Sequence, residues 1–181
     1  MNKHKIPRVL VIAGSDSSGG AGIQADIKTL TVFKVYSMTA ITAITAQNTN
    51  GVSSIESVSL DTIKRQIEAC ISDIGVDAIK IGMVNKGEIF DLIFEVLNKY
   101  KISKKGIPII LDPVMFAKGG FPLLENQAIS ALKEFIDKVG CILTPNIPEA
   151  ESLSGLKILN KNDMIKATKI ININGTPKIL L

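Results

Sequence analysis

The sequence has few of the side chains that commonly carry nucleophilic catalysis or bind transition metals. Its 181 residues include one histidine, two cysteines and no tryptophan, and aromatic residues make up 4% of the chain. Because the one histidine, His4, lies in a polar N-terminal stretch, a Ser-His catalytic pair and a histidine metal site are nearly excluded. Cys70 and Cys141 each stand within an apolar stretch, so we expect reduced core residues rather than a disulfide.

Strong charge and long apolar runs are also missing. The net charge of +4 is small and dispersed, which does not favour a nucleic-acid partner. No apolar run approaches the length of a membrane span, and the apolar segment near the N-terminus is too short for a signal peptide and is followed at once by Ser15 and Asp16. With 46% hydrophobic and 21% charged residues, the composition predicts one globular cytoplasmic domain, residues 1–181, without a membrane partner.

Apolar runs alternate with amphipathic segments along the chain. Strands are predicted over residues 8–13, 37–48, 78–82, 107–114, 141–146 and 178–181. Helices are predicted over residues 22–33, 61–74, 88–100, 126–139, 148–155 and 164–171, with Asp61 as the cap of the second. Such alternation is typical of an α/β fold with a mainly parallel sheet covered by helices.

The segment AGSDSSGGAGIQAD follows the first predicted strand and is rich in glycine. Gly14 and Gly19 have the spacing of a phosphate-binding loop, but Gly20 and Ala21 stand where that loop needs Lys and Ser or Thr. The match to a dinucleotide-binding fingerprint is weak, because its glycines begin several residues after the strand and the next strand ends in Gln47 instead of an acid. Neither a nucleoside triphosphate loop nor a dinucleotide site is therefore favoured here.

Polar side chains follow several predicted strands, where parallel sheets bind ligands. Asp26 and Gln47 could bond the edge of a small ring, although Asp26 could equally be a solvated helix acid and Gln47 a loop cap. Asp112 and Glu149 could hold Mg²⁺ through water. Alternatively, Asp112 bonds backbone amides and Glu149 begins a helix, and the spacing alone does not favour either reading.

Several motifs together resemble those of one enzyme family. In chain order they are AGSDSSGGAGIQADIKT, TAITAQNTNGV, KIGM, LDPVM, AKGG, PLL and TPNIPEAE. This order is similar to that of the bacterial hydroxymethylpyrimidine/phosphomethylpyrimidine kinases of thiamin biosynthesis, which belong to the ribokinase-like superfamily. The resemblance covers nearly the whole chain and implies a three-layer α/β/α fold with a mainly parallel sheet.

The resemblance also implies an activity, ATP-dependent phosphorylation of hydroxymethylpyrimidine and then of its monophosphate, with Mg²⁺. It implies that six residues line the pyrimidine pocket: Gly14, Ala21, Asp26, Gln47, Met83 and Val114. Asn146 and Glu149 would lie on the nucleotide side, and Asp112 and Glu149 would hold the metal. A pyridoxal kinase of the same superfamily is the alternative enzyme, and a non-catalytic pyrimidine-binding remnant is the alternative without chemistry.

The chain is shorter than the family pattern by about 80 residues, if a full α/β kinase domain is the standard. In the family a Gly-Thr-Gly-Cys-like loop, which would follow Leu181, supplies the anion hole and the catalytic base. We therefore expect no catalytic residue in this chain and little activity from it alone. The resemblance also suggests a homodimer and, as another partner, a separate C-terminal fragment.

Overall fold

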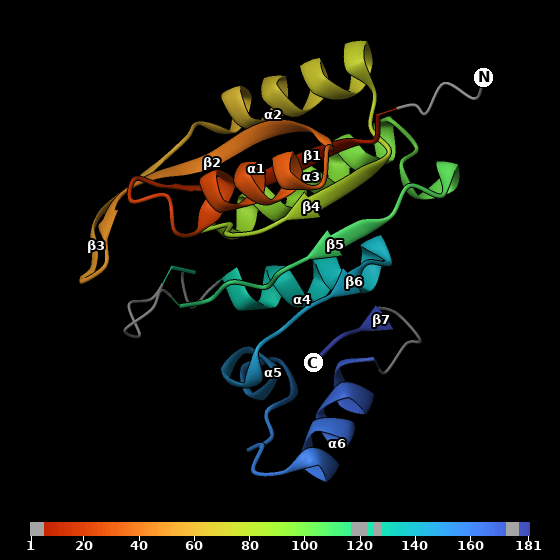
Figure 1. Ribbon diagram of the computed structural model, residues 1–181. Coiled ribbons are helices and arrows are strands. Elements are labelled where there is room, and N and C mark those ends of the chain that lie inside the picture. Colours follow the sequence, from red (N-terminus) through yellow and green to blue (C-terminus); the bar gives the residue numbers. More distant parts are fainter. Residues whose placement is uncertain (1–5, 117–122, 125–127, 173–177) are drawn as a thin grey trace.

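The computed structural model describes residues 6–116, 123–124, 128–172 and 178–181 (Figure 1). Within them, seven strands form one sheet: β1 (Arg8–Asp16), β2 (Tyr36–Asn48), β3 (Gly51–Ser57), β4 (Ala78–Ile81), β5 (Ile109–Leu111), β6 (Ile142–Leu143) and β7 (Lys178–Ile179). Their spatial order is β3-β2-β1-β4-β5-β6-β7, and neighbours are parallel except for the antiparallel pair β2 and β3. The predicted α/β class with a mainly parallel sheet is confirmed.

Helices connect the strands near the predicted places. They are α1 (Gly22–Val32), α2 (Leu60–Ala69) with a π-helical turn (Cys70–Ile74), α3 (Gly87–Lys99), a 3-10 turn (Ser103–Lys105), α4 (Ala128–Val139), α5 (Ile147–Ser154) and α6 (Lys161–Ile171). Of the helix predicted over 126–139, residues 126 and 127 lie outside the described residues. The prediction that Asp61 caps α2 is wrong: the Oγ atom of Ser59 accepts the Thr62 N–H at 3.3 Å, while Asp61 pairs with Arg65 inside the helix.

Two apolar layers hold helices on the two faces of the sheet. On one face, α2, α3 and α4 bury a large cluster with side chains such as Ile12, Ile81 and Leu111. On the other face, α1 packs through Ile23 on Val11 and neighbouring residues of β1 (Figure 1). Both cysteines are free, and Cys141 is buried in the larger cluster, where desolvation raises the pKa of its thiol to about 12. Cys141 is thus the expected core residue, whereas Cys70 is half-buried and packs against the edge of the same cluster.

The strand order places a crevice beside β1. From β1 the chain reaches β2 on one side through α1, and later returns to β4 on the other side of β1. The connections therefore diverge between β1 and β4, and ligands bind at such switch points beyond the carboxyl ends of the strands. Strand β3 was not predicted, because residues 51–57 are rich in serine and lie at the exposed edge of the sheet.

Candidate functional site

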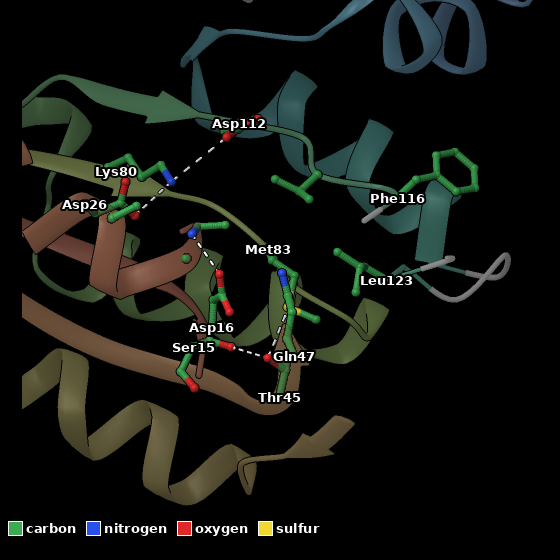
Figure 2. A pocket seen from close by; sticks show the side chains of 15 residues that line it. Ser15, Asp16, Asp26, Thr45, Gln47, Lys80, Met83, Asp112, Phe116 and Leu123 are labelled. Carbon is green, nitrogen blue, oxygen red and sulfur yellow. Dashed lines mark hydrogen bonds and ion pairs between the residues drawn. The ribbon is translucent and has the colours of Figure 1, made fainter. Parts of the chain in front are cut away.

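A cavity of about 340 Å³ opens at this switch point (Figure 2). It is lined by Gly14, Ser15, Asp16, Ala21, Gly22, Ala25, Asp26, Thr45, Gln47, Lys80, Met83, Asp112, Val114, Phe116 and Leu123. All six residues that the resemblance assigned to a ring pocket therefore line this one cavity, together with Asp112. Asn146 and Glu149 are not among the lining residues.

The carboxylate of Asp16, at the end of β1, organises the glycine-rich turn before α1. One oxygen accepts the N–H and the hydroxyl of Ser18 at 2.8 and 2.7 Å, and the other accepts the N–H groups of Gly20 and Ala21 at 3.0 and 2.8 Å. Burial raises the pKa of Asp16, but these hydrogen bonds outweigh it and hold the pKa below its ordinary value. Asp16 thus stays ionised and satisfied by the turn, so it shapes the cavity instead of offering a free acceptor.

Two glycines allow the turn to approach β1 and β4 closely. Gly22 has φ +57°, and a Cβ atom there would lie 2.5 Å from the carbonyl oxygen of Gly14. A Cβ atom at Gly14 would collide with the sulfur of Met83. The absence of side chains at these two positions therefore lets the turn pack directly on β1 and lets Met83 pack directly on Gly14.

Gln47 and its neighbours form the wall contributed by β2. The Gln47 backbone exchanges two hydrogen bonds with the Ser17 hydroxyl, at 2.7 and 2.8 Å. Its side-chain oxygen receives a long bond of 3.4 Å from the Thr45 hydroxyl, which donates more closely to the Ser15 carbonyl at 2.7 Å. The Gln47 side chain does not cap a loop within the described residues, so its amide is available at the cavity (Figure 2).

Three charged side chains meet at another part of the cavity. The ammonium of Lys80 lies 3.0 Å from an Asp26 carboxylate oxygen and 4.0 Å from an Asp112 oxygen (Figure 2). Burial raises the pKa of Asp112, Lys80 opposes this shift, and Asp26 adds to it. Two carboxylates therefore share one ammonium. Asp26 is not a solvated helix acid, because its side chain is only 23% exposed and pairs with Lys80.

Asn146 and Glu149 form a capping box at the start of α5. The Asn146 side chain accepts the Glu149 N–H and the Glu149 carboxylate accepts the Asn146 N–H, both at 2.9 Å. Glu149 is 3% exposed, and desolvation raises its pKa although backbone N–H groups of Asn146 and Met115 oppose the shift. The structure thus shows Glu149 beginning a helix, which was one of the two readings of its position.

The fit of Mg²⁺ rests on two carboxylates. Asp112 is near enough to Glu149 to raise its pKa by electrostatic repulsion. No group of three or more His, Cys, Asp or Glu side chains suited to a metal occurs among the described residues. Two carboxylates fit an ion that keeps several waters and binds substrate phosphates, as Mg²⁺ does, rather than a metal held by the protein alone.

Lys80 is the cavity residue that the sequence reasoning missed most clearly. It interrupts the apolar run of β4, and a charged residue inside a central parallel strand is itself a signal, since such strands are normally apolar throughout. Phe116 and Leu123 were also missed, because nothing in their sequence context distinguishes them from core residues. In the parts of the chain that the structure describes, no helix is sufficiently long and apolar to cross a bilayer.

Comparisons with known proteins agree with this architecture. A hydroxymethylpyrimidine/phosphomethylpyrimidine kinase of Haemophilus influenzae is 44% identical over 97% of the chain, and the chain spans 64% of that relative's length. The crystal structure of a phosphomethylpyrimidine kinase from Clostridium difficile superposes with a TM-score of 0.84 at 46% identity, covering 97% of this chain and 74% of the other.

Solved structures of pyridoxal kinases have the same fold. A pyridoxal kinase from Staphylococcus aureus, in complex with AMP-PCP and pyridoxal, superposes with a TM-score of 0.78 at 36% identity. The superposition covers 92% of this chain and 58% of that kinase. The architecture is therefore that of the ribokinase-like kinases, as expected. Because the model of the phosphomethylpyrimidine kinase family matches residues 16–181, the chain belongs to that family.

Proposed function

We propose that this chain provides the ring-binding part of an ATP-dependent kinase that acts on 4-amino-5-hydroxymethyl-2-methylpyrimidine and on its monophosphate in thiamin biosynthesis. The observation that supports it best is the convergence of the six predicted ring-pocket residues on one cavity. They come from β1, α1, β2 and the segments after β4 and β5, so only the folded chain unites them. Family membership supports the same substrate class.

In this proposal different residues of the cavity contact different parts of the substrate. Asp26 accepts a hydrogen bond from the ring amine, and Gln47 offers both a donor and an acceptor to the ring edge. Gly14 and Met83, which pack directly on each other, together form one surface that the ring contacts. The hydroxymethyl oxygen then attacks the γ-phosphorus of ATP, the bond to the β-γ bridging oxygen breaks, ADP leaves, and the proton of the hydroxymethyl group is released to solvent. In the second round an oxygen of the monophosphate is the attacking atom.

The nucleotide side is assigned to residues near α5. We propose that Asp112 and Glu149 hold Mg²⁺ through water and that Asn146 lies beside the nucleotide. When bound, Mg²⁺ offsets the negative charge on the transferring phosphoryl group. Asn146 and Glu149 keep each other in place through the capping box, so this acid is presented from a fixed helix start.

A titration of the 181-residue chain with the aminopyrimidine, with and without Mg-ATP, tests the proposal. Calorimetry should show ring binding, and Asp26→Asn should weaken it about tenfold, the loss expected when a charged acceptor is replaced by a neutral group. Asp61→Asn, at an exposed acid of α2, is the matched control and should bind normally. A chain that does not bind the ring contradicts the proposal.

Product formation then separates catalysis from binding. A chromatographic assay for pyrimidine mono- and diphosphate distinguishes a kinase from a module that binds the ring without turning it over. Pyridoxal is the second substrate to compare, because a pyridoxal kinase shares this fold. Preference for pyridoxal in both titration and turnover would replace the pyrimidine assignment. Homodimerisation and the cytoplasmic location remain predictions.

A further inference from the structure

Lys80 occupies an unusual position for a charged residue. It lies in the middle of β4, opposite Val11 of β1 and Ile110 of β5, and both of its strand neighbours, Ile79 and Ile81, are fully buried. Those neighbours pack into the large core, so Lys80 projects from the opposite face of the sheet, which α1 covers. An ammonium taken out of water at a central strand is costly unless acidic partners compensate it.

Its partners hold the ammonium of Lys80 in one place. Asp26 of α1 accepts a hydrogen bond at 3.0 Å, and Asp112, after β5, lies 4.0 Å away. A Cβ atom at Gly82 would come within 2.8 Å of the same nitrogen. The absence of a side chain at Gly82 therefore creates the space into which the ammonium fits.

The contact with Lys80 leaves half of the Asp26 carboxylate available. Lys80 binds the Oδ2 atom, and within the described residues the Oδ1 atom makes no hydrogen bond or ion pair. Asp16 also lines the cavity, but four donors already occupy its oxygens. Asp26 is thus the lining acid whose orientation is set on one oxygen and whose other oxygen can receive a ligand.

We propose that Lys80 is a positioning residue for ring recognition: it anchors one oxygen of Asp26 so that the other accepts the exocyclic amine of the ring, and it bridges this acid to Asp112. This inference rests on the proposed function. Lys80 acts through Asp26 and selects between rings by their hydrogen-bond donors. The alternative is an ion pair that only fastens α1 to the sheet.

A comparison of two ligands separates positioning from a purely structural role. The probes are 4-amino-5-hydroxymethyl-2-methylpyrimidine and the same ring without the 4-amino group, each titrated by calorimetry into the 181-residue chain. Lys80→Met should weaken binding of the amino ring about tenfold, as for loss of one hydrogen bond to a charged group, and should change the deamino ring little. A structural role would weaken both rings equally.

A control variant and a second test variant complete the experiment, so that the conclusion does not depend on Lys80→Met alone. Lys64→Met removes a lysine that is also 3.0 Å from its acid, Glu95, outside the cavity, and should leave both affinities unchanged. Gly82→Ala keeps every charge but crowds the ammonium, and should reduce the preference for the amino ring in the same direction. Thermal unfolding of each variant verifies that it is folded before titration.

The outcomes separate this inference from the function on which it rests. A wild-type preference for the amino ring that falls in the Lys80 and Gly82 variants supports both. A preference that survives in both variants overturns the role of Lys80 and leaves the proposed function standing. A wild-type chain that binds neither ring overturns the proposed function and the role of Lys80 with it.

Discussion

Replacement of Asp16 by asparagine tests how the glycine-rich turn is held. Asparagine has nearly the same shape, but one of its two acceptor oxygens becomes an NH₂ donor. In the native turn one carboxylate oxygen serves Ser18 and the other serves Gly20 and Ala21. Whichever way the amide is oriented, at least one backbone N–H faces a donor, and the remaining bonds lose their charge assistance.

The expected cost follows from the hydrogen bonds. Bonds to a charged group contribute about 1.5–3 kcal/mol and neutral ones about 0.5–1.5 kcal/mol, so the loss for this 3%-exposed residue should be about 3 kcal/mol. That corresponds to a fall in Tm of roughly 6–12 °C for a chain of this length. Denaturation in urea measures the free energy of unfolding directly. Asp61→Asn, at an exposed acid, is the control and should change it by less than about 0.5 kcal/mol.

The sign of the pH dependence provides a second criterion. The pKa of Asp16 is lowered on folding, so its stabilisation is complete above the unfolded value of about 3.9 and is lost as the pH falls through the folded value. The difference in free energy of unfolding between wild type and Asp16→Asn should therefore be constant near neutral pH and become smaller in acid. A gap below about 0.5 kcal/mol at pH 7, or one that widens in acid, would refute this account of the turn.

Two other substitutions address the turn and the start of α5. Gly22→Ala should lower the free energy of unfolding, measured in urea, by at least about 2 kcal/mol, because it adds a steric contact with the Gly14 carbonyl to a left-handed backbone. Gly106→Ala, with φ +68° and open space around it, is the control and should lower it by about 1 kcal/mol. Equal losses in the two variants would exclude the steric contribution. Glu149→Gln retains a side chain that can serve the capping box with Asn146. Because burial raises the pKa of Glu149, wild type should lose stability relative to this variant as the pH rises from about 4 to 7, and parallel unfolding curves across that range would contradict the shift.

Local patterns in the sequence were sufficient for most elements of the fold. Apolar periodicity marked α2 through Ile63 and Ile67, and a continuous apolar run marked β1. These signals are short-range, because each element needs only neighbouring residues to define its buried face. The same reasoning failed for β3, which is polar and lies at the sheet edge, where pairing with β2 determines the strand and burial does not.

The sequence by itself determined the fold class and the family. It also determined that Gly14, Gln47 and Met83 would lie near one cavity, because parallel strands bring their carboxyl ends to one edge of the sheet. Only the tertiary structure decided which charges face one another there. Lys80 and Asp26 are 54 positions apart, and their contact depends on how α1 packs across the sheet. By contrast, the capping box of Asn146 and Glu149 joins residues three positions apart and is a local feature of the chain. Distances between side chains of different elements depend on packing, which no local pattern contains.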